Sequence, residues 1–228
     1  MTVIRWVLPV LVVAWAVWGI FDYRQLKEAL QRGDRAALLR EYRLTIAGEV
    51  VGGVLALAAV GLSIVSRPPA LGLEVTVGMR SLVLGGLAGL VIGVVVPPIV
   101  ARRTGKKPAP VTVGDIAPLV PVTRTERRWY ALVALAAGVG EELVFRGFAL
   151  RLLTDLGIDG WAALAVAAVA FGLVHIYQGV AGVALTAALG LFLSVVYVAT
   201  GSLVAAMIVH AAVDFRLLVV DPAPTRPS

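Results

Sequence analysis

Cysteine is absent from this chain of 228 residues, and histidine occurs only twice, at His175 and His210. The lack of cysteine excludes structural disulfides, thiolate metal sites and a cysteine nucleophile. Charged residues are also scarce, at 15% of the sequence, whereas 60% of the residues are hydrophobic and the mean hydropathy is +0.94. Soluble domains contain about 45 to 50% apolar residues. The composition therefore predicts an all-α membrane protein, a polytopic bundle of transmembrane helices.

The net charge of +6 does not indicate a nucleic-acid partner, because most basic residues gather between apolar runs. Thirteen of the twenty Lys and Arg residues fall in residues 22–43 and 102–128. Such loops orient a membrane protein, so the expected partner is the lipid bilayer. Seventeen of the basic residues are arginine, and alanine, valine and glycine are abundant. This composition is typical of a GC-rich bacterial genome and suggests the bacterial cytoplasmic membrane.

Apolar runs predict about seven spans, at roughly 3–20, 44–65, 81–100, 129–153, 161–177, 180–200 and 203–220. The first run resembles a signal peptide in length. It contains three tryptophans and leads into no small-residue cleavage pattern, so we expect a retained anchor. The segment 22–43 has an intermittent apolar face and predicts a helix lying at the membrane surface, broken near Gly33 and Asp34. A solvated loop with some helix is the alternative for that segment.

The basic, proline-containing stretch in the middle of the chain predicts a boundary between two sections. We expect a three-span section over 1–100, a basic cytoplasmic loop over 101–128, a four-span core over 129–220 and a disordered tail over 221–228. With seven spans, the two basic loops lie on the same side of the membrane. The excess of positive charge on the inner side then predicts the N-terminus outside and the C-terminus inside.

Three details of the first section concern packing. Gly85, Gly89 and Gly93 recur every four residues and predict a smooth helix face for close contact with another helix. The pair Pro97-Pro98 is expected to end that span. Glu49 lies near the basic end of the second span, and snorkelling of its carboxylate to the interface is the expected explanation.

The fourth span carries charges in the middle of an apolar run, at Glu141, Glu142 and Arg146. Each such charge costs about 2.5 to 3.5 kcal/mol at the centre of a bilayer, so a functional reason is expected. Glu142 and Arg146 are one helical turn apart, which predicts an intrahelical ion pair. Glu141 points about 100° away from Glu142. It is the carboxylate without that partner, which suits a general base.

Two further pairs lie on later spans at the spacing of one helical turn. Phe171 precedes His175 on the fifth span, and His210 precedes Asp214 on the seventh. Members of each pair share a helix face, so the polar faces of the fourth, fifth and seventh spans can converge inside a bundle. Taken singly, each group is explained equally well as a contact between helices. Their joint occurrence favours a site that deprotonates a water and stabilises an oxyanion.

These motifs also form a known pattern. The sequence EExxxR begins at Glu141, FxxxH begins at Phe171 and HxxxD begins at His210, in that order on separate apolar runs. Together they resemble the CAAX-processing and bacteriocin-processing family of intramembrane proteases, which includes the type II CAAX prenyl endopeptidases. The resemblance covers about residues 129–220. It implies an endopeptidase that acts on a membrane-associated protein or peptide and needs no cofactor.

The resemblance also implies a role for each charged or ionisable residue of the motifs. We call these residues the polar set: Glu141, Glu142, Arg146, His175, His210 and Asp214. Glu141 would be the general base that activates water together with His175, and His210 with residue 214 would face the oxyanion. Glu142 and Arg146 would order the site. The family commonly has asparagine where this chain has Asp214, and an ionised aspartate cannot donate a hydrogen bond. Asp214 is therefore either protonated, or it orients His210 while that histidine donates.

Alternatives differ in the chemistry that they assign to the same residues. Two histidines and two glutamates could hold a zinc ion with an open position for water, although the usual HExxH spacing is absent. A non-catalytic family member, acting as a membrane regulator or immunity protein, would keep the fold without the reaction. A transporter would use the buried charges as an ion path, but we find no inverted repeat.

Overall fold

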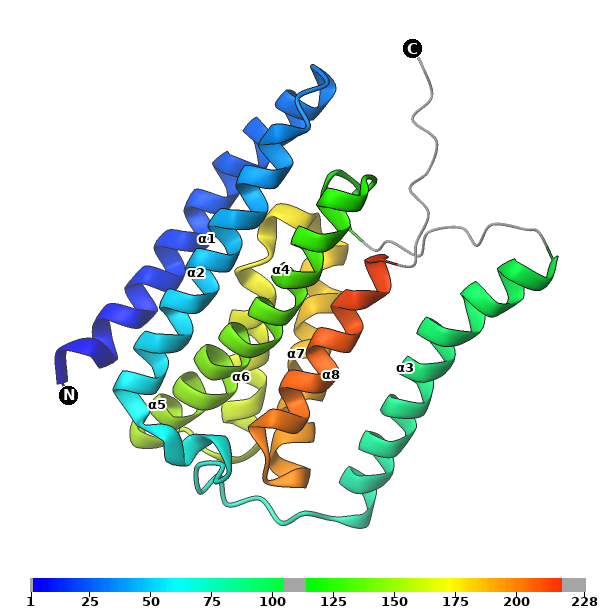
Figure 1. Cartoon of the computed structure of the whole chain (residues 1–228). Coiled ribbons are helices and arrows are strands. Elements are labelled where there is room, and N and C mark those ends of the chain that lie inside the picture. The colour runs from blue at the N-terminus through cyan, green and yellow to red at the C-terminus, as the bar shows by residue number, and fades with distance from the viewer. Residues whose placement is uncertain (1, 105–113, 219–228) are drawn as a thin grey trace.

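The computed structural model describes residues 2–104 and 114–218, and every regular element within them is helical (Figure 1). The α-helices are α1 (Thr2–Gln31), α2 (Ala36–Val60), α3 (Val77–Thr104), α4 (Arg124–Glu142), α5 (Leu150–Asp155), α6 (Gly160–Leu173), α7 (Gly179–Thr200) and α8 (Leu203–Phe215). A π-helical segment, Leu143–Ala149, joins α4 to α5. Turns of 3₁₀-helix occupy Leu62–Val65, Ala117–Leu119, Ile176–Gln178 and Arg216–Leu218. The prediction of an all-α bundle is confirmed.

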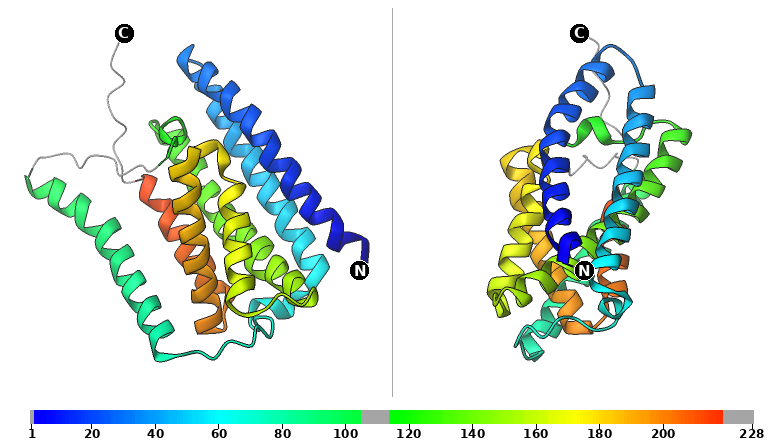
Figure 2. Two further views of the ribbon diagram at one scale, coloured as in Figure 1. Left: turned by 180° about the vertical axis from the view of Figure 1, so that it is seen from behind. Right: turned by 90° about the vertical axis from the view of Figure 1, so that its left-hand side faces the viewer.

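The first two helices form a long hairpin along one side of the molecule (Figures 1 and 2). The chain turns at the predicted place, since Gly33 has a φ of 82° and the Asp34 carboxylate accepts a hydrogen bond from the Ala36 amide. The prediction of a separate surface helix over 22–43 is wrong. These residues lengthen α1 and begin α2, because their apolar side chains are buried in a second hydrophobic core that they share with α4 and the Arg216–Leu218 turn. Its members include Leu26, Leu38 and Tyr42.

The helices from α4 to α8 form a bundle in which α4 lies beside α8 and α6 lies beside α7. α2 packs along α4 and along the π-helical segment, so the hairpin covers one face of this bundle. At the start of α4 the Thr123 side chain accepts from the Glu126 amide, and the Glu126 carboxylate accepts from the Thr123 amide. This capping box stabilises the first turn. The helical stretch that carries the predicted fourth span therefore begins before 129, at Arg124.

α3 stands at the edge of the molecule and meets the bundle mainly at α7 (Figure 1). The predicted glycine stripe is not a packing face at Gly85 and Gly89, where a Cβ atom would meet nothing within 4 Å. Gly86 makes the close contact instead, against the ring of Phe192 on α7. The third glycine of the stripe, Gly93, lies outside the described side chains. The predicted end at Pro97-Pro98 is also wrong, because the helix continues to Thr104 and prolines are tolerated in membrane helices.

Three helical stretches are each long and apolar enough to cross a bilayer: Arg5–Gln31, Ala36–Val60 and Ile176–Thr200. Within the described ranges, no helix of the other predicted spans is both long enough and apolar enough to cross a bilayer by itself. α6 is apolar but short, since its 14 residues extend over about 21 Å of a hydrocarbon core of about 30 Å. The stretch from α4 onward is interrupted by the charges of the polar set. The count of about seven spans is accordingly an approximation, whereas the membrane location follows from the long apolar helices.

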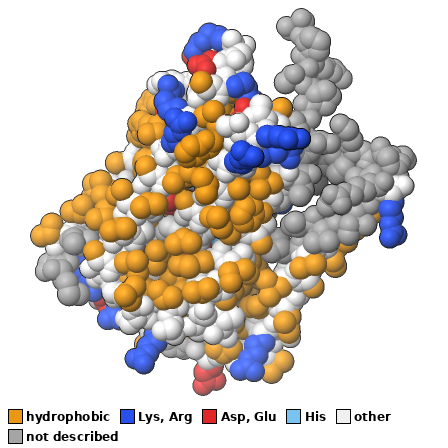
Figure 3. Space-filling view, viewed as in Figure 1, with side chains coloured by type: hydrophobic (Ala, Val, Ile, Leu, Met, Phe, Trp, Pro, Cys, Tyr) orange, Lys and Arg blue, Asp and Glu red, His pale blue; other side chains and the backbone are white. Residues whose placement is uncertain are grey.

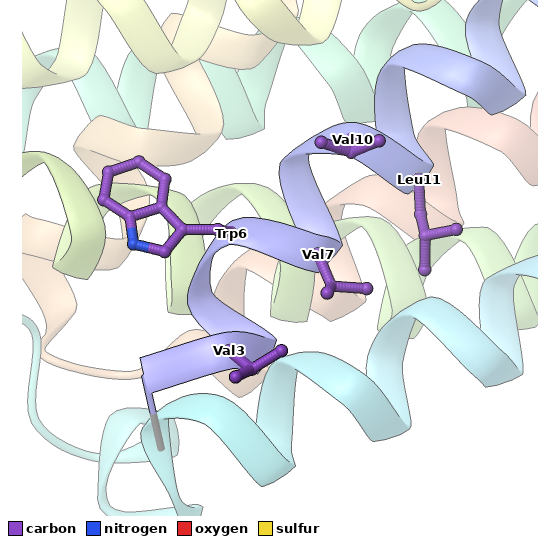
Figure 4. A pocket seen from close by; sticks show the side chains of 5 residues that line it. All are labelled: Val3, Trp6, Val7, Val10 and Leu11. Atoms are coloured by element: carbon purple, nitrogen blue, oxygen red, sulfur yellow. The ribbon is translucent and has the colours of Figure 1, made fainter.

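The surface has the distribution expected of a membrane protein. On the face shown in Figure 3, hydrophobic side chains cover the middle and most charged side chains gather toward the two ends. At the start of α1, a hollow is lined only by apolar side chains (Figure 4), namely Val3, Trp6, Val7, Val10 and Leu11. Val3 is 74% exposed and Trp6 is 57% exposed. Apolar surface of this kind is stable only against lipid or another protein.

Two predicted sections lie partly or wholly outside the described residues. The basic loop predicted over 101–128 includes residues 105–113, and the predicted tail is residues 221–228. The end of the predicted core, residues 219 and 220, lies outside them as well. The division of the chain into sections therefore stays a prediction.

Candidate active site

A buried ion pair lies at the junction of α4 and the π-helical segment. Arg146 Nη1 donates to Glu142 Oε1 over 2.7 Å, and the two side chains are 1% and 0% exposed. Arg146 Nη2 donates to the Gly190 carbonyl oxygen on α7 over 3.0 Å. The guanidinium also lies over the Phe171 ring, 4.2 Å from its centroid. The predicted intrahelical pair is therefore present, and it is anchored to two further helices.

Gly190 makes this arrangement possible because it has no side chain. A Cβ atom there would lie 2.9 Å from Phe171 Cδ1, and 3.3 Å from both Arg146 Nη2 and Ala168 Cα. Such distances are tighter than ordinary van der Waals contact. α7 can approach the ion pair and α6 only with glycine at this position.

His175 lies just beyond the end of α6, which corrects the prediction that the helix carries it on one face with Phe171. The His175 amide bonds to the Gly172 carbonyl, so the Phe171 carbonyl lacks its usual partner in the helix. The His175 ring takes this carbonyl, with Nδ1 2.8 Å from the Phe171 oxygen. A carbonyl only accepts hydrogen bonds, so Nδ1 carries the proton and the Nε2 atom of the neutral ring is an acceptor.

His210 and Asp214 lie one turn apart on α8, as the spacing predicted. His210 Nδ1 is 2.8 Å from Glu142 Oε1, so this ring donates to the carboxylate that also accepts from Arg146. His210 Nε2 lies 3.6 Å from Glu141 Oε2 and 3.7 Å from Asp214 Oδ2. The second ring nitrogen therefore faces two carboxylates.

Glu141 stands between the two imidazoles. Its Oε1 is 3.8 Å from His175 Nε2 and its Oε2 is 3.6 Å from His210 Nε2, distances that are too long for direct hydrogen bonds. Within the described part of the chain the buried Oε2 atom has no hydrogen-bond partner. The side chain is 15% exposed, whereas that of its neighbour Glu142 is fully buried. Of the two adjacent glutamates, Glu141 is the one that is open to a ligand.

Phe171 was predicted only as part of a motif, but its ring is the common contact of the site. Ring centroids of Phe171 and His175 are 5.1 Å apart, and those of Phe171 and His210 are 5.8 Å apart. Phe145 packs edge-on against the same ring at 5.1 Å. Together with the guanidinium of Arg146, these contacts hold four side chains around one aromatic ring. An apolar residue thus contacts both histidines and the arginine of the site.

Glu49 is the acidic residue that the sequence analysis misplaced. Its carboxylate turns toward α4 and packs against Gly140, where a Cβ atom would lie 2.7 Å from Glu49 Oε2. Glu49 lines the same cavity as Glu141, His175, His210 and Asp214. The only signal in the sequence was a charge inside an apolar run.

The cavity that holds these groups has a volume of about 1080 Å³ and lies between the hairpin and the bundle. Apolar residues form most of its wall. They include Trp15 and Trp18 from α1, Val51 and Leu55 from α2, and Leu189 and Phe192 from α7. A polar patch inside an apolar chamber can bind a peptide segment and exclude bulk water from its carbonyl group.

A metal ion requires several side chains that converge on one point. Among the residues that the structure describes, no three His, Asp or Glu side chains are arranged to hold one. Glu142 Oε1 is already shared by Arg146 and His210, so this atom is not free to bind a metal. The choice between a zinc site and a metal-free reaction stays a prediction.

Comparison with known proteins bears on the C-terminal part of the chain. Residues 124–216 match one family model, described as type II CAAX prenyl endopeptidase Rce1-like. The match covers somewhat less than half of the chain but includes all three motifs, whereas α1, α2 and α3 lie outside it. Searches of curated proteins and of solved structures gave no significant match. The family resemblance drawn from the motifs is confirmed for this part of the chain, since residues 124–216 match the Rce1-like type II CAAX prenyl endopeptidase model.

Proposed function

We propose that this protein is an intramembrane endopeptidase that hydrolyses a peptide bond in a membrane-associated protein or peptide, with Glu141 and His175 activating the attacking water. The family match supports a CAAX-type membrane protease in general. The observation that carries the proposed mechanism is the position of two acceptors that face each other. Glu141 Oε1 and His175 Nε2 lie 3.8 Å apart in the wall of the cavity.

Two acceptors at this distance suit a water molecule. The carboxylate cannot donate, and in the neutral tautomer of His175 that donates from Nδ1 to the Phe171 carbonyl, Nε2 is an acceptor. A water between them can donate one hydrogen to each and keep a lone pair directed at the substrate carbonyl carbon. Transfer of a proton to Glu141 then accompanies attack by the water oxygen.

Residues of α8 would stabilise the oxyanion that forms. His210 Nε2 lies on the opposite side of Glu141 from His175, and its orientation is held by the hydrogen bond from Nδ1 to Glu142. A proton on Nε2 would be available to the oxyanion. Asp214 faces the same nitrogen and would orient it or, when protonated, donate beside it. Glu142 and Arg146 would act on the geometry only, since both are buried and paired with each other.

We place the protein in a bacterial cytoplasmic membrane with the basic tip of the hairpin on the cytoplasmic side. The tip carries Lys27, Arg32 and Arg35, and the start of α4 carries Arg124, Arg127 and Arg128. Such an excess of positive charge favours the inner side and gives an N-terminus outside and a C-terminus inside. The apolar wall of the cavity then lies at the depth of the bilayer, where a membrane-associated substrate would reach it.

The experiment that tests the function is proteolysis in liposomes, with a library of quenched, membrane-anchored peptides. Wild type is expected to cleave part of the library, and His175→Ala is expected to abolish cleavage. A chelator is expected to leave the cleavage rate unchanged. Loss of cleavage after addition of the chelator would assign the reaction to a metal. Full biological activity in cells of both His175→Ala and Glu141→Gln would contradict the enzyme and support a non-catalytic partner.

A further inference from the structure

Glu49 is a carboxylic acid inside the cavity that the proposed reaction has not used. It comes from α2, which lies outside the segment that matches the family model. Glu49 packs against the residue that precedes Glu141, since its backbone oxygen and its Oε2 atom lie 2.6 and 2.7 Å from a Cβ built on Gly140. Glycine at 140 therefore makes room for this carboxyl group beside the proposed base.

Glu49 and Glu141 differ in their surroundings. The imidazoles of His175 and His210 both lie within 4 Å of Glu141. Glu49 forms no ion pair within the described ranges, and the charged side chains that act on it are two other carboxylates, Glu141 from α4 and Asp214 from α8. Glu49 and Glu141 line one cavity, and Glu49 packs against the residue next to Glu141. Two carboxylates placed this close together in a largely apolar cavity rarely carry charge at once, so such a pair shares one proton. A proton on His210 Nε2 would favour charge on Glu141, and Glu49 has no such neighbour, so we assign the shared proton to Glu49.

We propose that Glu49 is the acid partner of Glu141 and supplies the proton that the leaving amine needs. This inference rests on the proposed function. In the first step the water oxygen bonds to the carbonyl carbon while Glu141 takes the proton of the water. In the second step the carbon–nitrogen bond breaks while the proton of Glu49 passes to the amine nitrogen. Transfer of a proton from Glu141 to Glu49 restores both groups, and the net reaction consumes one water.

The pairing gives the hairpin of α1 and α2 a role in the chemistry. Residues 124–216 supply the base, both histidines and Asp214, but the acid comes from α2. The hairpin would therefore both wall the cavity and complete the reacting groups. A core cut from the chain at Arg124 would lack a proton donor for the leaving group.

Kinetics with three variants test the proposal in the full-length protein. Glu49→Gln keeps the shape of the side chain but cannot give up a proton, so kcat is expected to fall about 100-fold or more while KM changes little. The basic limb of the pH–rate profile, which reports loss of the proton from Glu49, is expected to disappear. Glu49→Asp keeps an acid and should retain part of the activity and the basic limb. Glu28→Gln, an exposed glutamate on α1, is the matched control and should behave as wild type.

An unchanged kcat and an unchanged basic limb in Glu49→Gln would overturn the proposal. If Glu49→Gln does not fold, Glu49→Asp decides: the proposal predicts a lower kcat and a basic limb that moves to the pKa of the new acid, and a basic limb that stays at the wild-type pH would overturn it.

A second measurement does not depend on cleavage, so it separates this inference from the proposed function. The carboxylic C=O stretch in infrared spectra is followed through a pH titration, in an Asp214→Asn background that removes the third carboxyl group. A pair that shares a proton titrates in two steps with well-separated midpoints. Glu49→Gln or Glu141→Gln should each leave a single step, with its midpoint between the two midpoints of the pair. If each variant instead removes one step and leaves the other in place, the two groups are independent and the proposal is wrong, even where wild type cleaves its substrate.

Discussion

The imidazole of His175 is bound to the carbonyl of Phe171, with Nδ1 2.8 Å from that oxygen. Nδ1 thus provides the hydrogen bond that the Phe171 carbonyl lacks at the end of α6, and Nε2 lies 3.8 Å from Glu141 Oε1. Structure and chemistry are divided between two atoms of one side chain. This division can be tested with substitutions that retain one nitrogen position at a time.

His175→Asn places an amide nitrogen near the position of Nδ1 but provides nothing at Nε2. We expect this variant to keep the cap of α6 and to unfold at the same denaturant concentration as wild type. Its cleavage rate should fall by about 100-fold or more, because the acceptor that faces Glu141 is lost. His175→Ala removes both functions and should also lower stability. Equal stability losses in the two variants would show that Nδ1 has no role in the end of the helix.

Gly190→Ala should disturb the site without changing any charged group. The new Cβ would lie 2.9 Å from Phe171 Cδ1 and 3.3 Å from Arg146 Nη2, so the ring and the guanidinium must move. Overpacking of this kind costs about 1 to 3 kcal/mol, and a lower melting temperature with reduced cleavage is expected. Gly89→Ala on α3 is the matched control, since a Cβ there meets nothing within 4 Å. Similar effects of both substitutions would point to helix propensity as the cause.

Removal of one partner from the buried ion pair should be costly. Glu142→Gln leaves Arg146 buried at 1% exposure without its counter-charge, which typically costs about 3 to 5 kcal/mol. Arg151→Gln breaks an exposed pair with Asp155 at the same spacing along the helix, and should cost about 0 to 1 kcal/mol. Unfolding in mixed detergent and denaturant compares the two. Equal losses would mean that burial does not distinguish the pairs.

Glu126 links the start of α4 to the hairpin and predicts a pH dependence. Burial alone would raise its pKa, but hydrogen bonds from Arg35 and from the amides of Thr123 and Val122 outweigh this effect and lower the pKa from 4.5 to about 2. A carboxyl group with a lowered pKa in the folded state stabilises above its ordinary pKa and loses that contribution as the pH falls.

Melting curves across pH therefore compare wild type with Glu126→Gln. The difference in stability should be full above about pH 4.5 and should shrink as the pH falls toward 2. Glu28→Gln, on an exposed side chain, should show no such window. A difference between wild type and Glu126→Gln that stays constant over this range would contradict the assignment.

The polar set could be predicted because its members lie at helical spacings inside apolar runs. The pair of Glu142 and Arg146 needs only one helix, so a spacing of four residues specifies it. The convergence of Glu141, His175 and His210 needs three helices, and here the joint pattern of motifs gave information that no single spacing holds.

Other features depend on distant contacts and could not be predicted. The burial of Glu49 follows from Gly140 on another helix, and nothing near Glu49 in the sequence records that neighbour. Gly86 packs against Phe192, while Gly85 and Gly89 are open, because the orientation of α3 decides which glycine faces α7. The residues 22–43 were predicted as a surface helix because their apolar face is narrow. In the structure that face packs on the bundle instead of on lipid.

Single-turnover cleavage by Glu141→Gln tests the central claim most directly, that Glu141 is the base of a hydrolytic site. The substitution keeps the shape of the side chain and removes its ability to take a proton. We predict a loss of about 100-fold or more in the chemical step, with the melting temperature and substrate binding preserved. A Glu141→Gln variant that cleaves the same peptide at the wild-type rate would contradict the account.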